Sequence, residues 1–279
     1  MSVIIYRARI TIEAMSWILG ACVMKIKRSD RRQFLWQGFV TLSTTLFLKA
    51  CTRNSNPTKE PTNSGLEGKS DSLAFISVPP ASGQTPTGLI VCLHGFGGNS
   101  QALASFAPKL NLPDYQLLFP NAPFPHSSQP GGRQWYDLNS SNLKGLTESR
   151  QRLRDWLESL EGITGIPLSR TILSGFSQGG AMTLDVGLTL PLAGLVSLSG
   201  YLHAKPKPTT GVSLPPVLIV HGRQDPIVPL SEAQRARDTL RSLGVAVKYQ
   251  EFDMGHEIRP VVLALMQRFV GDIRYHQLN

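Results

Sequence analysis

The sequence lacks the features that mark disulfide-stabilised, metal-binding and repeat proteins. It holds only three cysteines in 279 residues: Cys22 and Cys51 near the N-terminus and Cys92 inside an apolar strand pattern. Cysteines placed in this way form no disulfide framework. No internal repeat and no spacing typical of metal ligands is present, so we expect no metal site.

The bulk of the chain also lacks a strong charge of either sign. The formal net charge is +9, but residues 1–60 hold ten Lys and Arg against three acidic residues, a net of +7. Only +2 is left for residues 61–279. Nucleic-acid binding depends on a concentrated basic surface, so we expect no nucleic-acid partner.

No apolar run is long enough to span a bilayer comfortably. The uncharged stretch from Trp36 to Leu48 has 13 residues, whereas a membrane-spanning helix needs about 20. It follows a basic segment that opens at Met24 and contains SDRRQFL at 29–35, which resembles a twin-arginine translocation signal. We therefore expect export to the periplasm or the cell exterior. The alternative is a cytoplasmic enzyme with an amphipathic or disordered tail.

The chain is expected to divide into a leader, a linker and one domain. Cys51 ends the apolar stretch and resembles the cysteine of a bacterial lipoprotein signal, so membrane attachment is expected only if Cys51 is lipidated. Residues 52–71 are rich in Thr, Asn, Ser and Pro, which predicts a flexible linker between a leader at 1–51 and a domain at 72–279. A start at Met24 would make residues 1–23 an upstream extension.

Strand and helix patterns alternate along the domain. Strands are predicted near 73–77, 88–93, 115–119, 170–174, 193–198, 215–220 and 245–252, and helices near 100–110, 147–161, 178–189, 231–243 and 257–271. Such alternation predicts an α/β fold with a mostly parallel, doubly wound sheet and helices on both faces. Functional residues are then expected at the carboxyl ends of the strands.

A Gly-x-Ser-x-Gly run lies between a predicted strand and a predicted helix. The run is GFSQG at 175–179, with Ser177 at its centre. This context is that of a nucleophile elbow, in which the glycines on either side of the serine leave room for a very sharp turn. We therefore predict that Ser177 is a nucleophile. An ordinary glycine-rich loop would show the same pattern, so the assignment depends on partners for the serine.

Candidate partners follow in the chain order of an α/β-hydrolase. A serine hydroxyl needs a histidine as general base and a carboxylate that orients the histidine. Asp225 follows an apolar strand pattern and His256 follows the next one, so these two residues are the predicted acid and base. Asp185 and Asp253 compete with Asp225, but Asp185 falls on the helix after the nucleophile and Asp253 is only three residues before the histidine.

Two backbone N–H groups are candidates for binding the oxyanion of the tetrahedral intermediate. Gln178 follows the nucleophile and begins a predicted helix, whose dipole favours negative charge. The second donor is assigned to Phe96, in the glycine-rich loop after the strand at 88–93. His94 and His221 each end an apolar strand before a glycine, and they are expected to orient loops.

A loop of 27 residues separates the strand ending near Phe119 from the helix starting near Thr147. Loops of this length are usually functional, and this one contains Trp135 and Tyr136. We predict that this aromatic pair lines the acyl-binding pocket. The alternative is that Trp135 anchors the loop to the core.

Six motifs resemble the phospholipase/carboxylesterase family, which includes the acyl-protein thioesterases. They are LHGFGG at 93–98, FPNAP at 119–123, QWYDL at 134–138, GFSQGGAM at 175–182, HGRQDPIVP at 221–229 and MGHEI at 254–258. The resemblance spans roughly residues 72–272. It implies one α/β-hydrolase domain without a separate lid domain, acting without metal or organic cofactor. Its catalytic triad falls on Ser177, Asp225 and His256, and its oxyanion donors fall on Phe96 and Gln178.

The sequence thus predicts a serine carboxylesterase that hydrolyses a small-molecule or acyl ester, or a thioester, through an acyl-enzyme. A feruloyl-esterase-like or dienelactone-hydrolase-like enzyme would share the fold and the triad, although the latter normally has a cysteine nucleophile. A non-catalytic binding protein is the third alternative, and the presence of a competent residue at each catalytic position speaks against it. The pattern is silent on oligomeric state.

Overall fold

The computed structural model describes residues 72–207, 211 and 213–278. The predicted leader, twin-arginine segment, lipidation site and linker lie outside the described residues.

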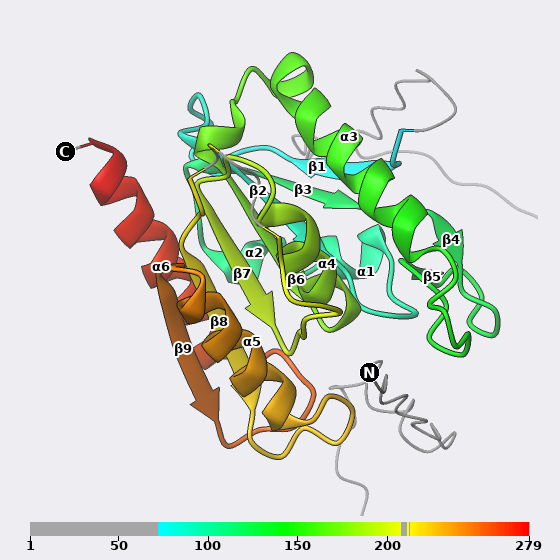
Figure 1. Cartoon of the computed structure of the whole chain (residues 1–279). Coiled ribbons are helices and arrows are strands. Elements are labelled where there is room, and N and C mark those ends of the chain that lie inside the picture. The colour runs from blue at the N-terminus through cyan, green and yellow to red at the C-terminus, as the bar shows by residue number, and fades with distance from the viewer. Residues whose placement is uncertain (1–71, 208–210, 212, 279) are drawn as a thin grey trace, which may run out of the picture. The chain divides into compact units, whose positions relative to one another are not determined.

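In the described part of the chain, seven strands form one sheet in the order β1-β3-β2-β6-β7-β8-β9 (Figure 1). They are β1 (Phe75–Val78), β2 (Gly88–Leu93), β3 (Tyr115–Pro120), β6 (Thr171–Phe176), β7 (Gly194–Leu198), β8 (Val217–Gly222) and β9 (Val247–Phe252). Every neighbouring pair is parallel except β1 and β3, which are antiparallel. The predicted mostly parallel sheet is confirmed.

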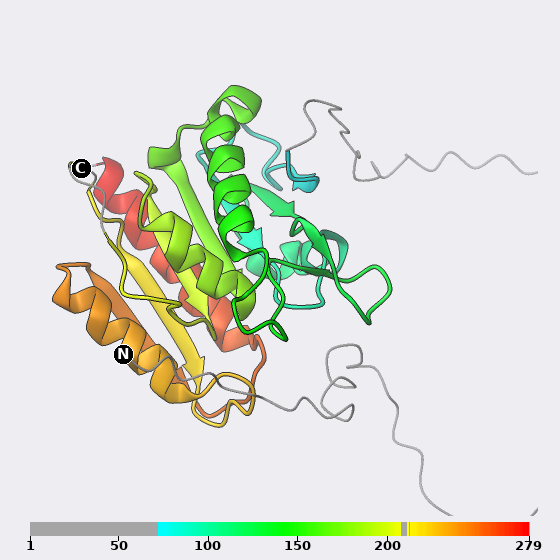
Figure 2. The ribbon, with the colours of Figure 1, turned by 45° about the vertical axis from the view of Figure 1, so that its right-hand side comes forward.

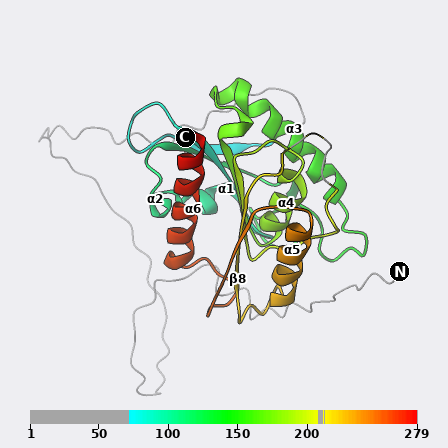
Figure 3. The ribbon, with the colours of Figure 1, turned by 60° about the vertical axis from the view of Figure 1, so that its left-hand side comes forward.

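The helices lie in two layers, one on each face of this sheet. They are α1 (Ser100–Ala104), α2 (Ala107–Leu110), α3 (Leu146–Thr164), a 3-10 turn η2 (Leu168–Arg170), α4 (Gln178–Gly187), α5 (Leu230–Ser242) and α6 (Pro260–Leu278). Helices α3, α4 and α5 cover one face and α1, α2 and α6 cover the other (Figure 2, Figure 3). The doubly wound arrangement is therefore also confirmed. Within the described part of the chain, no helix has the length and apolar character needed to cross a membrane.

The central strands are apolar on both sides because helices cover both faces of the sheet. All six residues of β2 are buried. Leu89 and Val91 belong to the core under α3, α4 and α5, whereas Ile90 and Cys92 belong to the core under α2 and α6. One strand therefore supplies two cores through the alternation of its side chains.

The structure departs from the predicted helices and strands in three places. The predicted helix at 100–110 is two short helices, because Pro108 in α2 has no N–H to donate to the preceding turn. The last helix begins at Pro260, a favoured first helical residue, rather than at 257. The long loop contains a hairpin of β4 (Phe124–Pro125) and β5 (Arg133–Gln134) that was not predicted.

Helix α3 offers a matched test of this packing. Leu157 is 0 % exposed, whereas Ile163 on the same helix is 43 % exposed. We expect Leu157→Ala to lower the free energy of unfolding by about 2–5 kcal/mol, through lost burial and the cavity left behind. We expect Ile163→Ala to change it by no more than about 0.5 kcal/mol. Urea denaturation of both variants measures the difference, and equal effects would contradict the observed face of α3.

Candidate active site

Ser177 lies at a strained turn between β6 and α4. Its φ is 55° and its ψ is −118°, a left-handed conformation that costs a non-glycine residue about 1–3 kcal/mol. A Cβ at Gly175 would clash with the Gly179 carbonyl, and a Cβ at Gly179 would clash with the Leu93 carbonyl. Both glycines of the motif are therefore required, as the elbow interpretation predicts, and the serine is held at the carboxyl end of β6.

The predicted base and acid are hydrogen-bonded to each other. Nδ1 of His256 lies 2.7 Å from Oδ2 of Asp225, whose side chain is fully buried. The other carboxylate oxygen of Asp225 accepts hydrogen bonds from the backbone N–H groups of Ile227 and Val228, each at 2.9 Å. The carboxylate is thereby fixed, and it leaves Nε2 of His256 as the nitrogen that can accept a proton.

The surroundings of Asp225 favour its ionised form. Burial by itself raises the pKa of this carboxyl, but the hydrogen bond to His256, the charge of that histidine and the two backbone N–H groups outweigh burial. The net effect holds the pKa of Asp225 below its usual value. An ionised carboxylate on Nδ1 keeps the proton on that nitrogen, which is the tautomer that a general base requires.

The nucleophile elbow contacts this histidine through the residue before the serine. The rings of Phe176 and His256 pack with their centroids 4.7 Å apart. Ser177 follows β6, Asp225 follows β8 and His256 follows β9, so all three lie at the carboxyl edge of the sheet. The structure thus gathers residues that are far apart in sequence on one edge, as expected for a doubly wound sheet.

The competing acids have other partners. Oδ2 of Asp185 lies 2.7 Å from Arg150 and 2.6 Å from His203. Asp253 pairs with Arg223 at 2.8 Å, and its side chain is 73 % exposed. Asp225 is therefore the candidate that the fold brings to the base. The group of Asp185, Arg150 and His203 was not predicted, because its members come from three separate segments without a shared motif.

The two other strand-end histidines contact loops, in agreement with their predicted role. Nε2 of His94 accepts a hydrogen bond from the backbone N–H of Ala122, so its Nδ1 donates to the carbonyl of Gly95. Burial lowers the pKa of His94 to about 4, which keeps the ring neutral. Nε2 of His221 lies 2.8 Å from the carbonyl of Val228, in the loop that also binds Asp225.

The segments that carry the predicted oxyanion donors flank the nucleophile. A Cβ at Gly95 would lie 3.3 Å from Cβ of Ser177, so the loop that contains Phe96 runs beside the serine. Gln178 is the first residue of α4, where N–H groups have no partner within the helix. Both segments therefore lie beside Ser177.

Trp135 and Tyr136 occupy a different position from the predicted pocket wall. Both are 0 % exposed. The indole Nε1 of Trp135 donates to the carbonyl of His94 at 3.0 Å, and the hydroxyl of Tyr136 lies 2.5 Å from that of Tyr201. Complete burial leaves neither ring free to line an open groove. The contacts of Trp135 correspond to the alternative that it anchors the loop.

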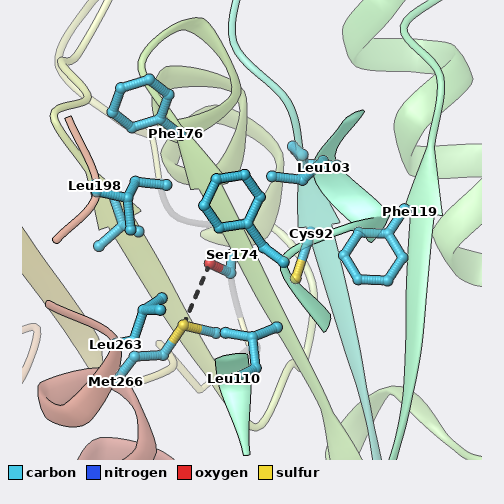
Figure 4. A pocket seen from close by; sticks show the side chains of 13 residues that line it. Cys92, Leu103, Leu110, Phe119, Ser174, Phe176, Leu198, Leu263 and Met266 are labelled. Atoms are coloured by element: carbon cyan, nitrogen blue, oxygen red, sulfur yellow. Dashed lines mark hydrogen bonds between the residues drawn. The ribbon is translucent and has the colours of Figure 1, made fainter. Parts of the chain in front are cut away.

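An apolar pocket lies behind the elbow, on the face covered by α1, α2 and α6 (Figure 4). Its walls include Phe176, Leu103 and Met266, and its free volume is about 30 Å³. Burial raises the pKa of the Cys92 thiol in this pocket to about 12, so the thiol stays neutral. The sequence did not reveal the pocket, because its walls come from strands and helices that are distant along the chain.

No group of three or more histidine, cysteine or carboxylate side chains that could hold a metal ion is found among the residues that the structure describes.

A strained serine elbow and a histidine–carboxylate pair at the carboxyl edge of a doubly wound sheet define an α/β-hydrolase. Solved structures agree with this class. The esterase PE8 is 32% identical, with a TM-score of 0.67 over 72% of this chain and 99% of that chain. Acyl-protein thioesterase 2 of Zea mays, at 24% identity and a TM-score of 0.58 over 71% of this chain and 98% of that chain, supports the fold alone.

The chain belongs to the phospholipase/carboxylesterase family, whose model matches residues 77–273. Acyl-protein thioesterase 1 of Gibberella zeae is 29% identical over 71% of this chain and 94% of its own length. The protein of the same name from Neurospora crassa is 30% identical over 65% of this chain and 84% of its own length. The protein is thus a serine hydrolase acting on esters, an esterase or thioesterase.

The comparisons contradict the predicted export. Twin-arginine signals are bacterial addresses, whereas these relatives are acyl-protein thioesterases of fungi and point to the cytoplasmic alternative. The prediction of a twin-arginine exported enzyme is therefore wrong. The short basic and apolar pattern that predicted export carries no information about the family of the whole chain.

The choice between the candidate acids can be tested directly. We expect Asp225→Asn to lower kcat by about ten-thousandfold, the loss seen when an amide replaces a triad carboxylate and stabilises the wrong tautomer. Asp253→Asn removes a carboxylate three residues from His256 that contacts Arg223 instead, so it should leave kcat within about twofold. Steady-state ester hydrolysis measures both, and a large loss in Asp253→Asn would reverse the assignment.

Proposed function

We propose that the protein is a serine carboxylesterase with Ser177, His256 and Asp225 as its triad. The backbone N–H groups of Phe96 and Gln178 form its oxyanion hole. The observation that carries the proposal is the 2.7 Å contact between His256 and a buried carboxylate, together with a serine at a glycine-dependent turn whose neighbour Phe176 packs on the His256 ring. These are the parts that nucleophilic attack on an ester requires.

The reaction runs in two halves. Oγ of Ser177 attacks the ester carbonyl while Nε2 of His256 takes its proton, and Asp225 stabilises the imidazolium that forms. The oxyanion of the tetrahedral intermediate accepts hydrogen bonds from the two backbone N–H groups. His256 then protonates the departing alcohol or thiol. Water, activated by the same histidine, hydrolyses the acyl-enzyme and returns the serine.

The substrate that fits best carries a short acyl chain. The apolar pocket behind Phe176 is formed by residues next to both the nucleophile and the base. Its free volume of about 30 Å³ exceeds the roughly 10–15 Å³ that a single water needs, and it suits a small apolar group. The names of the relatives add a thioester as an alternative to an oxygen ester, since both pass through the same acyl-enzyme.

The nucleophile is tested with p-nitrophenyl esters from acetate to palmitate. We expect turnover by the wild type and a loss on the order of 10⁶-fold in kcat for Ser177→Ala, as when other serine hydrolases lose their nucleophile. Ser159→Ala is the control, because its hydroxyl bonds only to its own helix α3. Retained activity in Ser177→Ala, or a wild type inert on every ester, would contradict the proposal.

The acyl pocket is tested by widening it. Met266 lines the pocket, whereas Val262 is buried on the same helix α6 and is not part of its walls. We expect Met266→Ala to raise kcat/KM for longer esters relative to acetate by about tenfold or more, since each methylene accommodated contributes roughly 1–3 kcal/mol. Val262→Ala should keep the wild-type chain-length profile. An unchanged profile in Met266→Ala would place the acyl chain elsewhere.

A further inference from the structure

The side chain of Gln178 is buried at a position where the reaction needs only its backbone. Gln178 is 1 % exposed. A buried primary amide is costly unless its donors and acceptor are satisfied. Its Oε1 accepts from the backbone N–H of Trp135 at 2.8 Å, and its Nε2 donates to the carbonyl of Tyr136 at 2.8 Å. The amide therefore pairs with two consecutive residues of the long loop.

The direction of this pairing is unambiguous. A backbone N–H can only donate and a backbone carbonyl can only accept, so the amide of Gln178 has one orientation that satisfies both partners. A carboxylate could not replace it, because it has no proton for the carbonyl of Tyr136. An apolar side chain of the same length would leave a buried N–H of Trp135 and a buried carbonyl without partners.

Residues 133–135 of the long loop are also hydrogen-bonded to the loop at residues 94–98, which carries Phe96, the other predicted donor. The indole of Trp135 donates to the carbonyl of His94 at 3.0 Å. The N–H of Gly97 donates to the carbonyl of Arg133 at 2.9 Å, and the N–H of Arg133 donates to the carbonyl of Gly98 at 2.8 Å. Phe96 therefore lies between two points at which its loop is tied to residues 133–135.

We propose that the side chain of Gln178 is a positioning group that sets the distance between the two oxyanion donors. The inference rests on the proposed function. The amide joins α4 to residues 135–136, and residues 133–135 join the Phe96 loop, so one connected set of hydrogen bonds spans both donors. Without the amide, the start of α4 and the Phe96 loop can shift independently. The two backbone N–H groups then no longer point to the same oxyanion position.

The test compares Gln178→Met with the wild type and with Gln116→Met. Methionine keeps the length of the side chain without its amide. Gln116 is the control because its half-buried amide donates to Oγ of Ser77 at 3.0 Å, on strands β3 and β1. Three quantities are measured on the full chain: kcat and KM for p-nitrophenyl acetate, and the inhibition constant of an alkyl boronic acid, whose serine adduct mimics the tetrahedral intermediate. Each kcat is divided by the folded fraction from thermal denaturation.

We expect Gln178→Met to lower kcat by about tenfold to a hundredfold, less than the 10²–10³-fold that follows outright loss of a donor. The boronic acid should bind more weakly by a similar factor, while KM changes by less than about threefold, because the donors act mainly in the transition state. Gln116→Met should keep all three values. Wild-type kcat and inhibitor affinity in Gln178→Met would overturn the inference.

Gln178→Glu provides a second variant with a pH signature. Its ionised carboxylate cannot donate to the carbonyl of Tyr136, whereas its protonated form can. Burial raises the pKa of a glutamate above its usual value of about 4.3, so the activity of the variant relative to the wild type should rise as pH falls from 8 to 5. A ratio independent of pH would count against the pairing. A wild type without esterase activity would refute the proposed function instead, and the two failures are therefore distinct.

Discussion

The structure depends on the close approach of α4 to the ends of β6 and β2. The elbow at Ser177 allows that approach only because Gly175 and Gly179 carry no side chains. The same approach places the strained serine, with its φ of 55°, at the carboxyl edge of the sheet. Strain at one residue is tolerated because the buried strand β6 and the largely buried helix α4 hold it from both sides.

Around that elbow, hydrogen bonds to backbone groups hold the side chains of the candidate site in place. Asp225 is fixed by two backbone N–H groups, His94 links a backbone N–H to a carbonyl, and the side chain of Gln178 pairs with the backbone of the long loop. Backbone groups are positioned by the fold itself, so they lose little freedom on binding a substrate. The candidate site is therefore preorganised before an ester binds, which is the condition for strong stabilisation of a developing charge.

The sequence predicted the sheet, both helical layers and the contact between His256 and Asp225, because each of these follows from local strand and turn signals in a known order. It did not predict the two-residue strands of the hairpin, which are too short to show an alternation. It placed Trp135 at a pocket wall because large aromatic residues in a long loop suit either a pocket or the core. The burial of Trp135 depends on contacts with His94 and Gln178, and such contacts between distant segments leave no local pattern.

The position of β9 at one edge of the sheet has a consequence for the synthesis of the protein. Among the described residues, β9 pairs only with β8 in the main sheet and is the last of its strands in chain order, and His256 follows it. A nascent chain that has completed β6 and the elbow holds Ser177, the proposed nucleophile, but not yet His256, the proposed base. With the proposed triad, esterase activity requires that β9 has joined the sheet, so activity is then a readout of completed folding.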